Sequence, residues 1–461
     1  MRTADGSVKS TGSVPTSNNN STTSIALAKG EYVQFKGDNA TYYNGGASRI
    51  SCSKNCYVYG NIMSLVTSTG YATETELTGE KAFQELFSYN SYIINHAEKE
   101  LVLPATTLAA TCYSNMFQSC RKLTQTPELP AKTLTRYCYN EMFSGCKGLT
   151  QAPELPATTL AEACYFRMFK ECTGLTQAPK SLPAETLEES CYKEMFSGCT
   201  SLTKAPVLSA TTLALYCCQQ MFENCTSLTH APELLAMELK IYCYYGMFKG
   251  CTSLVKSPAL PATTLAEYCY TSMFQGCTSL TQVPENLPAT TLAKNCYEYM
   301  FKGCTKLTHT PEKLLPATNL KEFCYRYMFQ DCTSLVNAPE LPATTLAQSC
   351  YNSMFQGCTS LTEAPVLSAT ELVAYCYQEM FSGCTSLTQA PELPATVMKL
   401  SCYQGMFSGC TSLTKSPKLT VTGFSTTCYK EMFKGCSALN EVTFLYIETS
   451  TGSSYTSYIA D

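Results

Sequence analysis

A motif of about 26 residues recurs along this chain, and this periodicity limits the possible folds more than any other feature. Each copy reads Cys, usually Tyr, two variable residues, Met-Phe, two more residues and a second Cys. Thirteen copies run from Cys112 to Cys436, at intervals of 26 residues that lengthen to 27 twice and to 28 once. A unit of this size cannot bury its own apolar side, so the units must stack on one another. The sequence therefore predicts a solenoid.

Within one unit, the apolar residues recur at intervals of about four, which is typical of one face of a short helix. In the unit 263–287 these residues are Leu265, Cys269, Tyr270, Met273, Phe274 and Cys277. Thr263 or Thr264 can cap this helix, and Gly276 lies where a helix commonly ends. Residues 280–285 then alternate as in a short extended segment, which Pro284 keeps brief. We therefore predict an α/β repeat with one short helix and one short parallel strand per unit, forming an elongated right-handed solenoid with a single strand column.

The repeat divides the chain into four parts. Residues 1–23 are rich in Ser, Thr, Asn and Gly, and we expect them to form a disordered linker. Residues 24–81 alternate short apolar runs with Gly and Asn turns, which indicates a small N-terminal β-module and the start of a cap. Residues 82–447 form the solenoid of about fourteen units, with a degenerate first copy at 82–103 and a last strand at 442–447. Residues 448–461 are a polar tail.

Cysteine is abundant, but its placement favours a structural role. The thirteen repeat pairs contain 26 of the 29 cysteines. Eight helical residues span about 12 Å, and a disulfide tolerates a Cα separation of only about 4.4 to 6.8 Å, so we expect reduced thiols buried in the core. Cys52 and Cys56 lie four residues apart before the array, where a local disulfide and two free thiols are both compatible with the sequence. The array has no cysteine or histidine cluster with zinc-ligand spacing, so we expect no metal site.

Composition and motif content argue against several classes of function. The formal net charge of −4 provides no basic surface for nucleic acid. No apolar run reaches the roughly 18 residues of a membrane span. Residues 1–24 lack the apolar core of a signal peptide, and we expect the sequence to be a truncated piece of a longer protein. The three histidines are well separated in the stack and no nucleophile and base pair is visible, so we expect neither catalysis nor a cofactor.

One position in each unit varies while its neighbours stay almost constant, and it remains polar. This position lies two residues after the strand leucine, and a solenoid commonly binds partners through its strand surface. The candidate ligand-binding residues in this column are Lys204, His230, Lys256, Gln282, His309, Asn337 and Glu363. The first three should form a basic stretch about 10 Å long at strand spacing, moderated by Glu233, that suits a carboxylate, a sulfate or an acidic protein loop.

Two alternatives to this strand surface remain open. The column can consist of solvated positions under weak constraint, with no ligand. The variable pairs between Tyr and Met in the predicted helix, such as Glu298 with Tyr299 or Arg326 with Tyr327, also differ from copy to copy. These pairs make the opposite face a competing binding surface.

The unit resembles the BspA-like, or Treponema-type, leucine-rich repeat. Met273-Phe274, Gly276-Cys277, Leu280 and Pro284 match its pattern, and comparable matches cover residues 82 to about 442. The repeat departs from the commoner 23-residue form by running at 26 residues and by placing Cys at the start of the helix. The resemblance implies a leucine-rich-repeat solenoid that is extracellular or attached to the cell surface. It also implies a non-enzymatic adhesin or recognition module, expected to be monomeric, for a host or microbial protein or glycan; a structural spacer that presents another domain is the alternative.

Overall fold

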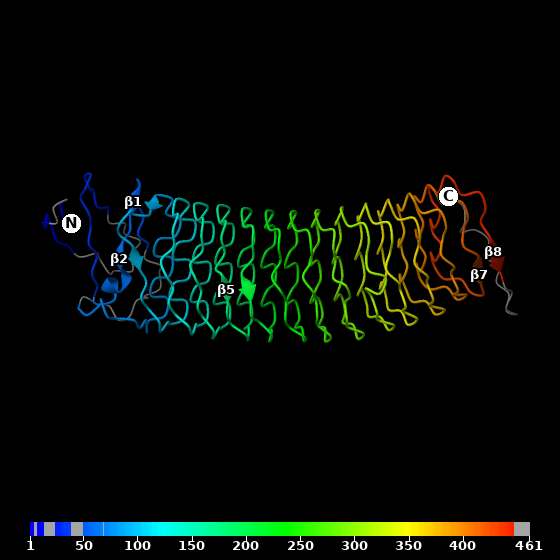
Figure 1. Cartoon of the computed structure of the whole chain (residues 1–461), viewed down its shortest axis with the longest axis horizontal. Coiled ribbons are helices and arrows are strands. Elements are labelled where there is room, and N and C mark those ends of the chain that lie inside the picture. The colour runs from blue at the N-terminus through cyan, green and yellow to red at the C-terminus, as the bar shows by residue number, and fades with distance from the viewer. Residues whose placement is uncertain (4–6, 13–23, 38–48, 68, 447–461) are drawn as a thin grey trace.

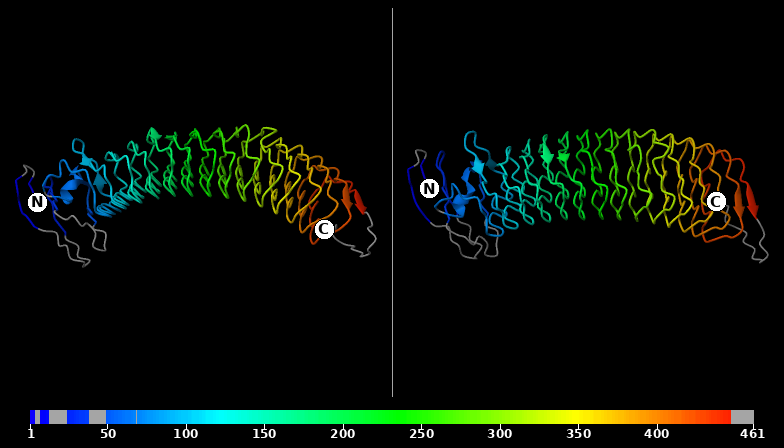
Figure 2. Two further views of the ribbon diagram at one scale, coloured as in Figure 1. Left: turned by 90° about the horizontal axis from the view of Figure 1, so that it is seen from below. Right: turned by 60° about the horizontal axis from the view of Figure 1, so that its bottom comes forward.

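The chain forms a long stack of similar units that bends into an arc (Figures 1 and 2). The structure is a computed structural model, and it describes residues 1–3, 7–12, 24–37, 49–67 and 69–446. Most of the predicted linker and the predicted tail at 448–461 lie outside the described residues. The elongated shape and the unit-on-unit stacking agree with the predicted solenoid.

Regular secondary structure is sparse. The strands are β1 (Cys56–Tyr57), β2 (Gly60–Asn61), β3 (Ile93–Ile94), β4 (Leu101–Val102), β5 (Ser181–Leu182), β6 (Val207–Leu208), β7 (Leu419–Val421) and β8 (Phe444–Tyr446). They pair in parallel as β1 with β3, β2 with β4, β5 with β6, and β7 with β8. Strand β8 falls within the predicted last strand at 442–447.

Elsewhere, neighbouring units are joined by single-residue parallel bridges. One column of bridges passes through the predicted variable position, for example from Lys204 to His230 and from His230 to Lys256. A second column passes through the threonines that precede each motif, as between Thr133 and Thr159. The prediction of a single strand column was therefore too simple, because each unit contacts the next through more than one extended segment.

The predicted helix in each unit is wrong. Within the described ranges the one helical element is a short 3-10 helix, η1 (Ile62–Leu65), which precedes the array. Each repeat instead contains a ten-residue segment, which we call the turn ribbon, from the residue before its first cysteine to its second cysteine. In the ribbon 137–146, alternate amides donate within the ribbon, as from Asn140 to the Tyr137 carbonyl at 3.2 Å. The amides between them donate to the next repeat, as from Tyr139 to the Cys164 carbonyl at 3.0 Å.

The turn ribbon has a four-residue backbone period, which explains why its sequence resembles a helix. Tyr137, Glu141 and Gly145 have φ values of 55°, 50° and 72°, so every fourth residue is left-handed. Each such residue reverses the turn and brings the next pair of side chains back to the same side. The apolar pairs therefore recur at intervals of four, as on one face of an α-helix. Gly276, with φ of 73°, occupies one of these regular turn positions and does not cap a helix.

The core consists of side-chain columns that run the length of the array. The Phe of each motif stacks on the Phe of the next repeat with ring centroids 5.4 to 5.8 Å apart. The Tyr after the first cysteine forms a second column with spacings of 5.7 to 6.0 Å, which is interrupted where Cys218 takes the place of Tyr. Phe83 and Phe87 of the degenerate copy extend these columns by stacking on Tyr113 and Phe117. One continuous core thus serves all units.

The second cysteine of each motif links one repeat to the one before it. Its thiol donates to the carbonyl of the preceding repeat's Phe at 3.0 to 3.3 Å in all thirteen copies, as from Cys146 to Phe117. The 26 repeat cysteines and Cys218 are unpaired, as predicted for 26 of them. Cys52 and Cys56 form a disulfide, which resolves the alternative that the sequence left open.

Candidate functional site

The predicted strand-surface residues lie where the bridge column runs along the outside of the stack. Parallel bridges join Lys204, His230, Lys256 and Gln282 into one run, and His309, Asn337 and Glu363 into a second. All seven side chains are exposed. We call this set the strand column. It provides aligned polar side chains, and its N-terminal run contains the predicted basic stretch.

The two histidines of the strand column are held in similar local contacts. The Nδ1 atom of His230 is 2.8 Å from the Thr229 hydroxyl, and that of His309 is 3.0 Å from the Thr308 hydroxyl. Each contact is between neighbours along the chain, so it orients the ring without enclosing it. The strand column therefore offers exposed charge along an open surface.

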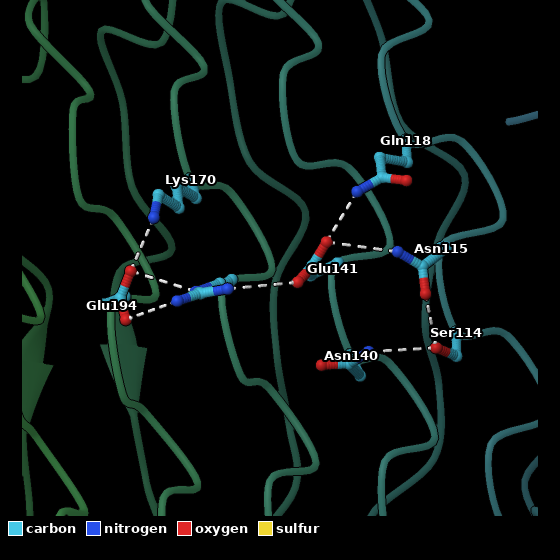
Figure 3. Close-up of polar contacts among 8 residues, drawn as sticks. Ser114, Asn115, Gln118, Asn140, Glu141, Lys170 and Glu194 are labelled. Carbon is cyan, nitrogen blue, oxygen red and sulfur yellow. Dashed lines mark hydrogen bonds and ion pairs between the residues drawn. The ribbon is translucent and has the colours of Figure 1, made fainter. Parts of the chain in front are cut away.

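The outer surface of the turn ribbon carries the variable pairs that the sequence marked as a competitor. Near the N-terminal end of the array these side chains form a polar network across four repeats (Figure 3). Glu141 accepts from Gln118 at 2.5 Å and pairs with Arg167, which also binds Glu194 at 2.9 Å. Burial raises the pKa of Glu194, but hydrogen bonds from Arg167 and Lys170 outweigh this effect and hold the pKa below its ordinary value. The charged side chains of this network are thus paired with one another.

Further along the ribbon surface the network gives way to a groove with a volume of about 570 Å³, within the range of small-molecule sites. We call it the tyrosine groove. It crosses the ribbons of five consecutive repeats, so its length is about four strand spacings, or roughly 19 Å. The lining residues are Gln219, Gln220, Tyr242, Tyr245, Tyr268, Thr271, Ser272, Gln275, Glu298, Tyr299 and Arg326.

The groove exists because neighbouring repeats place side chains of different size at equivalent ribbon positions. The central repeat has the small residues Thr271 and Ser272 at its variable pair. The flanking repeats have Tyr245 and Tyr299 there, and both line the groove. The depression is thus a direct result of two small residues between larger ones.

The aromatic side chains of the groove are held by one another. Tyr242 stacks on Tyr268 with ring centroids 4.6 Å apart and meets Tyr245 edge-on at 5.6 Å. Tyr299 stacks on Tyr327 of the next repeat at 4.7 Å. Rings fixed in this way lose little rotational freedom when a ligand contacts them, which favours binding.

The charged groups of the groove neutralise each other. Glu298 is buried, and its carboxylate accepts hydrogen bonds from Asn295 at 2.5 Å and from Arg326 at 2.6 Å. Arg326 in turn lies over the Tyr327 ring at 5.3 Å. The lining therefore contains one carboxylate and one guanidinium that are paired, together with amides and hydroxyls, and its net charge is zero.

Sequence reasoning identified part of the groove. It named Tyr299, Glu298 and Arg326 as members of variable pairs on a competing face. It missed Tyr242 and Tyr268, which precede the first cysteine of two successive repeats. The signal was present, because Tyr216, Tyr242 and Tyr268 occupy that position in three repeats in a row and stack at 5.2 and 4.6 Å.

The thiols offer no reactive centre. The 26 cysteines from Cys112 to Cys428, with Cys218 among them, are buried, and burial raises the pKa of Cys120 and Cys172 to about 12. A thiol that stays protonated at neutral pH is a poor nucleophile and a poor metal ligand. In the described part of the chain, no three His, Cys, Asp or Glu side chains gather as a metal site would require. The same residues include no helix long and apolar enough to cross a bilayer.

Two solved structures are similar to this chain. The chain is similar to a leucine-rich repeat protein from Bacteroides ovatus, with 18% identity over 77% of this chain and 90% of that chain and a TM-score of 0.47. It is also similar to a leucine rich cell surface protein from Faecalibacterium prausnitzii, with 15% identity over 66% of this chain and 84% of that chain and a TM-score of 0.31. No curated protein matches the chain.

The family comparison covers most of the array. The model of the BspA type leucine rich repeat region, which contains six copies of the repeat, matches residues 110–254, 192–335, 239–362 and 322–457. These overlapping matches extend over more than half of the chain and agree with the motif and with the stacked units. The chain therefore belongs to the family of BspA type leucine rich repeat proteins.

Proposed function

We propose that this protein is a non-enzymatic recognition module at the cell surface that binds a protein or glycan through the outside of its solenoid. The observation that carries this proposal is the clustering of tyrosines in the tyrosine groove. Binding sites concentrate aromatic anchors with a few polar groups in one patch. In a structural spacer we expect exposed tyrosines to be scattered over the surface. Membership of the BspA type family supports the surface location and the binding role.

A binding screen with the full chain tests this proposal. The chain is passed over immobilised host extracellular matrix proteins and glycans, together with the double variant Tyr268→Ala, Tyr299→Ala. Tyr375→Ala is the matched control, because Tyr375 occupies the same ribbon position as Tyr268 but does not line the groove. We expect one or more partners to bind the parent chain and the control but to lose at least about tenfold affinity for the double variant. A spacer would bind nothing in the screen, and that result would contradict the proposal.

The strand column supports a second binding surface of a different chemistry. Lys204, His230 and Lys256 are exposed and adjacent, and they suit an acidic protein loop or a sulfated ligand. Binding there should weaken as salt rises, because exposed charges are screened. If Lys204→Ala with Lys256→Ala reduces binding of a partner while the groove variant does not, the partner uses the strand column.

A further inference from the structure

The tyrosine groove has the chemistry of a site for a neutral oligosaccharide. We propose that it binds an uncharged glycan chain of several sugar units, and this proposal rests on the recognition role proposed above. The groove combines aromatic and polar groups, and a sugar needs both. Each pyranose ring has a face of weakly positive C–H bonds that packs on the negative face of an aromatic ring, and an edge of hydroxyls that needs hydrogen-bond partners.

The groove supplies both kinds of partner within one lining. Tyr245, Tyr268 and Tyr299 supply aromatic surface, whereas Tyr242 is stacked between Tyr216 and Tyr268 and lines the groove with its edge. Side-chain amides and hydroxyls also line the groove, from Gln219, Gln220, Gln275, Thr271 and Ser272, and such groups can donate and accept as a sugar hydroxyl does. Thr271 already donates to the Asn295 carbonyl at 2.5 Å and Gln220 to Glu223 at 2.6 Å, so these two side chains offer mainly acceptor oxygens. An apolar peptide would leave these polar groups unpaired, at a cost in binding free energy.

The charges of the groove lining favour a neutral glycan over an acidic one. The only charged side chains of the lining are Glu298 and Arg326, and they are bound to each other. A sialylated or sulfated ligand would have to compete with Glu298 for Arg326 and would leave the buried Glu298 carboxylate without its cationic partner. The groove therefore favours an uncharged ligand, in contrast to the strand column.

The arrangement of the rings also suits a chain rather than a single sugar. The four tyrosines come from three successive repeats, because Tyr242 and Tyr245 belong to the same one, and the groove extends for roughly 19 Å at strand spacing. Tyr242 and Tyr268 line the groove from the position before the first cysteine, whereas Tyr299 lines it from the variable pair of a later repeat. A ligand in contact with both sets must span more than one repeat.

A groove-filling substitution tests the proposal without removing any native contact between rings. At the ribbon position of Ser272, with φ of 57°, two later repeats have Tyr299 and Tyr327 with φ of 57° and 58°. The fold thus accepts tyrosine at this position, and Ser272→Tyr should stack on Tyr299 and fill the groove. Ser353→Tyr is the matched control, because it should stack on Tyr327 at the other end of the same column, outside the groove.

The experiment applies the full chain and both variants to an array of neutral, sialylated and sulfated oligosaccharides. We expect neutral oligosaccharides to bind, Ser272→Tyr to reduce their affinity by about tenfold or more, and Ser353→Tyr to change it by less than about twofold. Thermal melting of all three chains verifies that both variants fold. Binding of neutral glycans that survives Ser272→Tyr would overturn the site.

Other outcomes separate this inference from the proposed function. If no neutral glycan binds but a purified matrix protein does, and Ser272→Tyr abolishes that interaction, the groove is a protein site and the glycan inference fails alone. If only sialylated or sulfated glycans bind, and Lys204→Ala with Lys256→Ala removes them, the ligand is anionic and uses the strand column. If neither glycans nor matrix proteins bind, the recognition role fails together with the inference.

Discussion

At the scale of single residues, the second cysteine of each motif both fills the core and donates a hydrogen bond, and a purely apolar residue could only fill the core. Its sulfur fills the core with no exposed surface in most copies, and its thiol donates to a Phe carbonyl of the preceding repeat. That carbonyl already accepts the amide of its own repeat's second cysteine, as Phe117 does from Cys120 at 3.0 Å. The thiol therefore satisfies the second lone pair of a buried carbonyl, which favours cysteine over valine or alanine at this position.

The buried thiols give a direct prediction. Counting thiols with Ellman's reagent in the denatured chain, without reductant, should give about 27, because only Cys52 and Cys56 are bonded. The native chain should react far more slowly, because burial holds the thiols protonated and inaccessible. A count near zero in the denatured, non-reduced chain would mean that the repeat cysteines are cross-linked.

Cys218 interrupts the tyrosine column and provides a second prediction. It takes the place of a Tyr between Tyr192 and Tyr244, and these three residues border a cavity of about 10 Å³. The Phe column continues unbroken through the same repeat at 5.6 Å spacing, so the units are not displaced there. A cavity of this size holds about one water molecule, so an added ring must displace its neighbours, and we expect Cys218→Tyr to lower the free energy of unfolding by about 1 to 3 kcal/mol.

The reverse substitution in an intact part of the column is the control. Tyr270→Cys removes a ring between Tyr244 and Tyr297, and it should lower the free energy of unfolding by about 3 kcal/mol. Both values come from denaturant titration of the full chain. A gain of stability in Cys218→Tyr would contradict this prediction and would mean that the surrounding leucines move aside without cost to admit the ring.

At the scale of elements, the sequence predicted the stacking of units but not the turn ribbon. Stacking follows from the repeat alone, and the predicted degenerate copy at 82–103 does join the stack, since its Phe83 and Phe87 extend the columns. The helix did not follow, because a period of four in apolar residues is common to an α-helix and to a chain of turns with every fourth residue left-handed. Side-chain order along Cys269, Tyr270, Met273 and Phe274 is the same in both. What separates them is backbone hydrogen bonding between repeats, which a single unit cannot reveal.

Glycine substitutions distinguish the two backbones in solution. Glu171 is exposed and left-handed, with φ of 58°, at a position where most repeats have glycine. A residue with a side chain costs about 1 to 2 kcal/mol in this conformation, and glycine costs more conformational entropy, so Glu171→Gly should leave stability unchanged or raise it by up to about 1 kcal/mol. Ser144→Gly, at a right-handed position of the ribbon, should lower it by about 0.5 to 1 kcal/mol. If the segment were a helix, both substitutions would lower the free energy of unfolding by similar amounts. Denaturant titration of the two variants distinguishes these outcomes.

The sequence predicts the strand column more fully than the tyrosine groove, because the two surfaces depend on different numbers of positions per repeat. The strand column depends on one position per repeat, so its alignment follows from the period. The tyrosine groove depends on size differences among several ribbon positions in adjacent repeats. Ser272 and Thr271 become a depression only because Tyr245 and Tyr299 lie beside them, and this requires the orientation of the ribbon side chains.

At the scale of the whole molecule, the same residue types are buried in every unit. The effect of pH on the stability of one repeat therefore adds up along the array. Burial raises the pKa of core thiols along the array, to about 12 in Cys120, Cys269 and Cys324 among others, and raises the pKa of column tyrosines such as Tyr270 and Tyr325 well above the ordinary value. All these shifts have the same sign. The molecule as a whole should therefore respond to alkaline pH far more strongly than a protein with one buried thiol.

The sign of this response follows from proton linkage. In the unfolded chain a thiol ionises at about pH 8.5 and a tyrosine at about pH 10, whereas in the folded chain both stay protonated. Unfolding then releases protons, and stability that is complete below about pH 8.5 is lost as pH rises toward the folded pKa. At pH 10 one buried thiol costs about 2 kcal/mol of stability. A few such groups equal the whole net stability of a typical domain, about 5 to 15 kcal/mol.

We therefore expect the array to unfold cooperatively between about pH 9 and 10 at room temperature. Melting temperatures measured from pH 6 to 11, with reductant present, should be constant up to about pH 8 and then fall steeply. If repulsion between exposed charges lowered the melting temperature at alkaline pH, high salt would reduce the effect, because salt screens mainly exposed charges. A decrease caused by ionisation of buried thiols should persist in high salt. A melting temperature that stays constant up to pH 10.5 would show that the thiols and tyrosines are not buried as protonated columns.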